Sequence, residues 1–112
     1  MAKVKEVNLE QGLPTVEVAM SRLTNEVTTA KMSGYKALIL IHGFGSSGTG
    51  GSIKAATKTK LQQTMFRGII KDKVNGEEWD VKKRAFVSHC PQLNDFDRRI
   101  SGNKGITVLL LK

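Results

Sequence analysis

The chain has 112 residues, a single cysteine and a formal net charge of +8. This length suits one domain with one core, and one cysteine excludes an intramolecular disulfide and a multi-cysteine zinc site. The sequence has no apolar run of about 18 residues and no basic-then-apolar leader, so we expect a cytoplasmic protein without membrane association, formed by a single domain over residues 1–112.

The first part of the sequence predicts a strand, a helix and a second strand. Loose alternation over residues 4–9 indicates a half-buried strand. A turn at residues 12–15 leads into a helix that Thr15 caps and that Ser33-Gly34 ends. The uninterrupted aliphatic run Ala37–Ile41 predicts a buried strand.

The second part predicts two helices and two strands. We expect a helix from residue 52 to about residue 67, and a weaker strand over residues 69–74. A short helix is expected over residues 81–90, where Asp80 caps it and Pro91 limits it. Residues 93–104 are polar and predict an exposed loop. The aliphatic run Ile106–Leu111 predicts the last strand.

Strand composition predicts the order of the sheet. The two aliphatic strands are expected in the centre, and the two polar-interrupted strands are expected at the edges. Two consecutive right-handed crossovers place both long helices on one face. We therefore expect an α/β fold, an α+β two-layer sandwich of βαβαββ order, with a four-stranded mixed sheet of order 1-2-4-3.

A glycine-rich loop follows a histidine between the second strand and the second helix, where residues 38–52 read LILIHGFGSSGTGGS. Glycines let a backbone approach a ligand closely, and the helix N-terminus behind the loop offers unpaired N–H groups to an anion. The segment therefore predicts a phosphate-binding site. Its expected members are Gly43, Phe44, Gly45, Ser46, Ser47, Gly48, Gly50, Gly51 and Ser52.

Positive charge is densest directly after this loop. Residues 51–70 hold four lysine or arginine residues and no acid. A basic helix beside an anion-binding loop suits a phosphate backbone, so we expect nucleic acid as the partner. Lys54 and Lys58 are candidate phosphate contacts, and Phe44 is a candidate stacking platform for a base. The alternatives are a solvated helix face for the lysines and a loop anchor for Phe44.

Two nucleotide-binding motifs fit the loop only in part. Gly45 and Gly50 have P-loop spacing, but Gly51 stands where the P-loop requires lysine, so a nucleotide triphosphatase is not expected. Residues 43–48 spell G-x-G-x-x-G after a strand, but the chain is too short for a second mononucleotide-binding half. Dinucleotide binding stays an alternative.

Three blocks of the sequence resemble the small MutS-related (Smr) domain family. His42-Gly43-Phe44-Gly45 resembles the family's His-Gly-x-Gly motif. Residues 8–19 resemble its first strand, glycine turn and Thr-Val-Glu helix start, and residues 102–108 resemble its closing Asn-x-Gly-x-Thr-Val strand. The resemblance implies a stand-alone Smr domain with a fold like the C-terminal domain of translation initiation factor three. It also implies a DNA or RNA partner, on the ribosome for some members, and endonuclease activity in several members.

His42 and Glu10 are the candidate catalytic residues. We expect the His42 imidazole to be neutral beside a helix N-terminus and to act as a general base while loop amides hold the phosphate. The family's Asp-x-His pair is absent from residues 8–12, where Glu10 is the candidate base or ligand of Mg²⁺ or Mn²⁺. Two alternatives stay open: a structural histidine, and a non-catalytic module that docks on nucleic acid or a ribosome. The sequence does not distinguish DNA from RNA.

Overall fold

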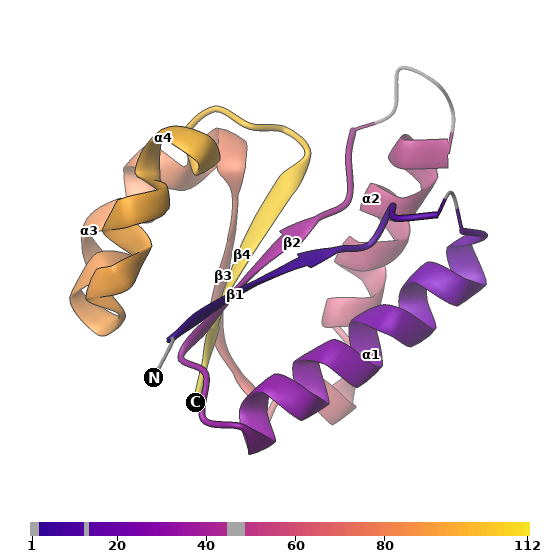
Figure 1. Ribbon diagram of the computed structural model, residues 1–112, viewed down its shortest axis with the longest axis horizontal. Coiled ribbons are helices and arrows are strands. Elements are labelled where there is room, and N and C mark those ends of the chain that lie inside the picture. The colour runs from indigo at the N-terminus through magenta and orange to yellow at the C-terminus, as the bar shows by residue number, and fades with distance from the viewer. Residues whose placement is uncertain (1–2, 13, 45–48) are drawn as a thin grey trace.

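Figure 1 shows the protein as a computed structural model, which describes residues 3–12, 14–44 and 49–112, with only the backbone described at residues 49 and 50. Four strands form one sheet in the order β1-β2-β4-β3. They are β1 (Val4–Asn8), β2 (Ala37–Ile41), β3 (Ile70–Asn75) and β4 (Ile106–Leu111). β1 is parallel to β2, and β4 is antiparallel to both β2 and β3. The predicted mixed sheet and its order are confirmed.

Two long helices, α1 (Val16–Met32) and α2 (Thr49–Leu61), pack together on one face of the sheet (Figure 1). Thr15 begins α1, because its hydroxyl accepts a hydrogen bond from the Val18 N–H at 3.2 Å. Each helix buries apolar side chains at helical spacing against β2 and β4, which builds the first core. The helix expected over residues 52–67 ends earlier than predicted, at Leu61, and a 3-10 turn, η1 (Thr64–Phe66), follows it.

A second layer of helices covers the opposite face of the sheet, so the molecule has three layers where a two-layer sandwich was expected (Figure 1). After the 3-10 turn η2 (Gly76–Glu78), α3 (Trp79–His89) packs on the sheet. α3 begins at Trp79, two residues before the predicted start, and the residue at its N-cap position is Glu78 rather than Asp80.

The expectation of an exposed loop over residues 93–104 is wrong. Residues 91–100 form a 3-10 segment, η3 (Pro91–Phe96), and a short helix, α4 (Asp97–Ile100). Leu93 and Ile100 are fully buried in a second core, which lies on the opposite face of the sheet from the first. Two large apolar side chains within a polar stretch are enough to hold it on the sheet, because each contributes roughly 1.5–3 kcal/mol on burial.

The connections at one edge of the sheet, meaning the edge formed by the ends of the strands, lie close together. The carboxyl ends of the parallel strands β1 and β2 meet there, and the antiparallel β4 begins there after Gly105. β3 ends at the same edge, since Asn75 pairs with Thr107. An open sheet usually binds ligands at such an edge. In the described part of the chain no helix is long and apolar enough to cross a bilayer.

Candidate nucleic-acid interface

His42 follows β2 directly, and its side chain lies inside the protein. The residue is 1% exposed, with Nδ1 at 2.7 Å from the Gly43 carbonyl oxygen and Nε2 at 2.8 Å from the Thr107 hydroxyl oxygen. Because a carbonyl only accepts, Nδ1 carries the proton of the neutral ring. Burial is the largest cause that lowers the pKa of His42, so the ring is neutral at neutral pH.

Hydrogen bonds extend from His42 to the ends of β3 and β4. The Thr107 hydroxyl oxygen lies 3.0 Å from Asn75 Oδ1 on the neighbouring strand. The backbone N–H groups of His42 and Gly43 both donate to the Gly105 carbonyl, at 2.9 and 3.1 Å. We call the residues His42, Gly43, Asn75, Gly105 and Thr107 the histidine network. Its bonds hold the start of the glycine loop against β4 and β3.

Glu10 lies beside the start of the glycine loop. Gly43 has a φ of +68°, and a Cβ there would lie 2.5 Å from both carboxylate oxygens of Glu10. The turn that carries Glu10 is held from two sides: its N–H donates to Asn8 Oδ1 at 2.9 Å, and Arg22 donates to the carbonyls of Asn8 and Gln11. Both candidate catalytic residues therefore lie at the same edge of the sheet, with the ring buried and the carboxylate partly exposed.

The donor set around Glu10 offers little to a metal ion. Within the residues that the structure describes, no group of three or more histidine, cysteine or acidic side chains is close enough to hold one. Mg²⁺ and Mn²⁺ prefer several oxygen ligands. A Mg²⁺ or Mn²⁺ ion at Glu10 would therefore find fewer than three such side-chain ligands among the described residues.

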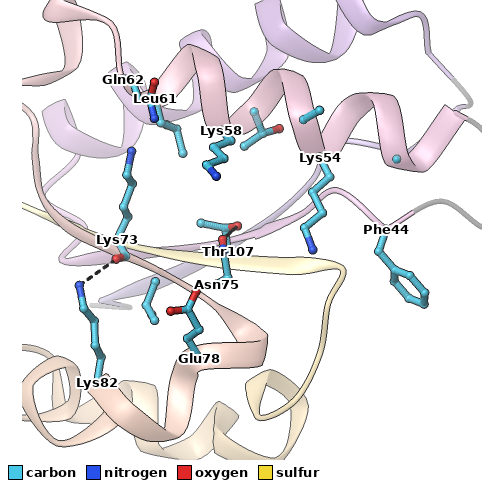
Figure 2. A pocket seen from close by; sticks show the side chains of 14 residues that line it. Phe44, Lys54, Lys58, Leu61, Gln62, Lys73, Asn75, Glu78, Lys82 and Thr107 are labelled. Atoms are coloured by element: carbon cyan, nitrogen blue, oxygen red, sulfur yellow. Dashed lines mark hydrogen bonds between the residues drawn. The ribbon is translucent and has the colours of Figure 1, made fainter.

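A pocket of about 420 Å³ opens between α2 and β3, beside the histidine network (Figure 2). Among the described residues that line it are four lysines from three elements, Lys54, Lys58, Lys73 and Lys82, which we call the lysine cluster. α2 supplies the first two, β3 the third and α3 the fourth. Asn75 and Thr107 line the same pocket, so the histidine network forms part of its wall.

The four residues of the lysine cluster differ in whether they form an ion pair with a carboxylate. Lys54 Nζ lies 3.0 Å from Glu77 Oε1, a contact that lowers the pKa of that carboxyl group, and Lys82 Nζ lies 3.0 Å from Asp72 Oδ1. For Lys58 and Lys73, the described residues supply no carboxylate within ion-pairing distance. These two ammonium groups are therefore available to an external anion.

Lys54 and Lys58 were predicted from the sequence as phosphate contacts, whereas Lys73 and Lys82 were not predicted. The alternation of β3 is a local signal for Lys73, since Lys73 and Asn75 share one face of the strand. Only the sheet order brings that face next to α2.

The structure describes the two ends of the glycine loop. Phe44 is 58% exposed, and Figure 2 shows it at one end of the pocket with its ring turned away from the lysines. Gly51 lines the pocket and Ser52 is exposed at the start of α2. Gly45, Ser46, Ser47 and Gly48 lie outside the described residues, and at Gly50 only the backbone is described.

Comparison with known proteins supports the fold. No family model and no curated protein matches the sequence. Among solved structures, the chain is similar to the Smr domain of MutS2 from Thermus thermophilus, with a TM-score of 0.61 and 23% sequence identity over 96% of this chain and 98% of that one. The chain thus has the fold of an Smr domain, and the resemblance seen in the three sequence blocks is confirmed at the level of the fold.

Proposed function

We propose that this protein binds nucleic acid through the lysine cluster and the adjoining start of the glycine loop. The observation that carries the proposal is the convergence of four lysines from three elements around one pocket. An Smr-like fold supports it, because members of the family that the sequence resembles bind DNA or RNA.

The pairing of the lysines suits a backbone of phosphates. Lys58 and Lys73 can contact phosphate directly, while Lys54 and Lys82 must first leave Glu77 and Asp72. Exposed ion pairs of this kind contribute about 0–1 kcal/mol, so a phosphate can replace the carboxylate at little cost. Binding is therefore expected to weaken steeply with salt, with a slope of roughly 0.7–0.9 in log affinity against log salt per phosphate contact.

The test measures binding of labelled single-stranded RNA, single-stranded DNA and duplex DNA at two salt concentrations. We expect the double variant Lys58→Gln/Lys73→Gln to bind about tenfold or more weakly and to lose about one to two units of salt slope. The matched control is Lys60→Gln/Lys71→Gln, which removes the same charge from the same two elements at residues that do not line the pocket. Equal losses in both variants, or no binding at low salt, would overturn the proposal.

Endonuclease activity is a second candidate, and the contact between Glu10 and Gly43 favours it. Glu10 is partly exposed and can take a proton from water or from a ribose 2′-hydroxyl, whereas His42 is enclosed and holds the loop in place. Glu10→Gln should then abolish cleavage of a bound strand and leave its affinity unchanged. Binding without cleavage in the unaltered protein would favour the docking module, with the ribosome as a candidate partner.

Retention of a nicotinamide or flavin cofactor is the result that would instead favour dinucleotide binding. Glu10 lies against Gly43, and the acidic residue in the described lining of the pocket is Glu78. A ribose-binding carboxylate is part of that alternative. The nucleic-acid proposal needs no such group.

A further inference from the structure

The lining of the pocket combines apolar and charged side chains. Leu61, Val74 and Ala55 contribute apolar surface to the lining, and the lysine cluster contributes the charge. Pockets of about 300–1,000 Å³ with apolar walls and a few placed polar groups are typical of small-molecule sites, and this one has about 420 Å³. The pocket is therefore suited to a ligand with one apolar part and one anionic part.

Thr57 supplies an unused polar group in the lining. The residue is 1% exposed, and its hydroxyl has no hydrogen-bond partner among the described residues. A threonine within a helix can bond back to the carbonyl four residues earlier, as Thr59 does on the same helix at 3.3 Å from the Ala55 carbonyl oxygen. Thr57 does not make this bond. Since buried hydroxyl groups are normally paired, its partner is expected from a ligand.

We propose that this pocket holds one unpaired nucleotide of the bound strand, with the base between α2 and β3 and a phosphate on Lys58 and Lys73. The proposal rests on the proposed function and adds the kind of strand that is bound. The apolar walls match the faces of a base, while the Thr57 hydroxyl and the Asn75 amide can bond to its edge. A base inside a duplex cannot enter, so the strand must be single or must release the base.

The charges of the lining agree with this orientation. Figure 2 shows the ends of Lys58 and Lys73 on one side of the pocket and the Glu78 carboxylate on the other. A phosphate next to the two unpaired lysines is therefore kept away from Glu78. On its own side, the Glu78 carboxylate can accept a hydrogen bond from an amino group of a base.

The experiment follows backbone amide signals of the full chain by NMR during titration with a trinucleotide and with the matching trimer of abasic sites. Both ligands carry the same phosphates, but only the first carries bases. We expect the trinucleotide to shift the signals of Thr57 and Asn75 and to bind at least fivefold more tightly than the abasic trimer. Titration with nucleoside monophosphates and with inorganic phosphate forms a third arm.

The variant that isolates the hydroxyl is Thr57→Val, which keeps the shape of the side chain. This variant should bind the trinucleotide about fivefold more weakly, and its affinity for the abasic trimer should not change. Its unfolding transition shows whether the fold is retained. Thr59→Val on the same helix is the control, because Thr59 does not line the pocket. It should bind the trinucleotide with the affinity of the unaltered protein.

The possible failures are distinguishable. Equal binding of both trimers, with no effect of Thr57→Val, would overturn the pocket proposal and leave nucleic-acid binding intact. Binding of monophosphates without either trimer would assign the pocket to free nucleotides and overturn its link to a strand. No binding of any nucleotide or strand would overturn both proposals.

Discussion

Polar groups lie next to both nitrogens of the buried His42 ring, and this environment sets its protonation. The Gly43 carbonyl oxygen accepts a hydrogen bond from the Nδ1–H, and the Thr107 hydroxyl lies next to Nε2. Burial disfavours the charged ring and lowers its pKa, while the Gly43 carbonyl acts in the opposite direction and is the smaller effect. His42 is therefore a buried, neutral side chain beneath the start of the loop.

The stability of the protein should depend on pH through His42. Its pKa is lower in the folded chain than its ordinary value of 6.5, so the unfolded chain binds the extra proton first as the pH falls. The free energy of unfolding is then fully maintained above about pH 6.5 and is lost progressively as the pH falls below that value toward the folded pKa. Urea titrations from pH 7.5 to pH 5 measure this loss, and His42→Gln should reduce it.

Glu77 and Asp97 act outside this pH window. The pKa values of Glu77 and Asp97 are lowered from 4.5 and 3.8, mainly by hydrogen bonds from Lys54 and from Trp79. Their contributions to stability are lost only at lower pH. A free energy of unfolding that stays constant down to pH 5 in the unaltered protein would contradict the role given to His42.

Gly43 is required both by its backbone and by its neighbour. Alanine there should cost about 1–2 kcal/mol for the left-handed backbone, and its Cβ would collide with the Glu10 carboxylate. Denaturant unfolding measures the sum of these two costs. The double variant Gly43→Ala/Glu10→Ala should recover only the part of the free energy that is lost through the collision with Glu10. Gly68→Ala is the control, since nothing lies within 4 Å of its added Cβ and its φ is not positive. An equal loss in the control would contradict the argument.

At the scale of elements, the layer of α3, η3 and α4 completes the fold. Trp79 packs edge-on against Phe86 with ring centroids 5.8 Å apart, and its indole N–H donates to Asp97 Oδ1 at 2.9 Å. The bond ties α4 to the start of α3. η3 and α4 then bring Leu93 and Ile100 onto the sheet.

Truncation of either buried side chain tests this layer. Leu93→Ala or Ile100→Ala should each lower the free energy of unfolding by about 2–5 kcal/mol, because a fully buried side chain leaves a cavity. Val81→Ala on α3 is the matched control, since Val81 is 86% exposed, and it should change stability by less than about 0.5 kcal/mol. A loss below 1 kcal/mol in the buried variants would mean that residues 91–100 do not stabilise the sheet.

At the scale of the whole molecule, the sheet order decides which residues share the site. Because β4 inserts between β2 and β3, Thr107 lies between His42 and Asn75. The crossover from β2 through α2 to β3 brings the ends of Lys58 and Lys73 to the same side of the pocket (Figure 2). The four residues of the lysine cluster, which come from separate parts of the sequence, are thereby gathered around one pocket.

Local patterns determined the strands, both long helices and the position of the glycine loop, since periodicity, caps and glycines act over a few neighbouring residues. Composition also determined the sheet order, because central and edge strands differ in their solvent exposure. Only the tertiary structure decided that His42 is enclosed, that residues 91–100 cover the sheet and that Lys73 and Lys82 join the α2 lysines. Each of these depends on contacts between residues far apart along the chain, as His42 and Thr107 are, 65 positions apart. Which side chains are buried, and which charged side chains lie together, depends on how distant segments pack. A short stretch of sequence holds no information on that packing.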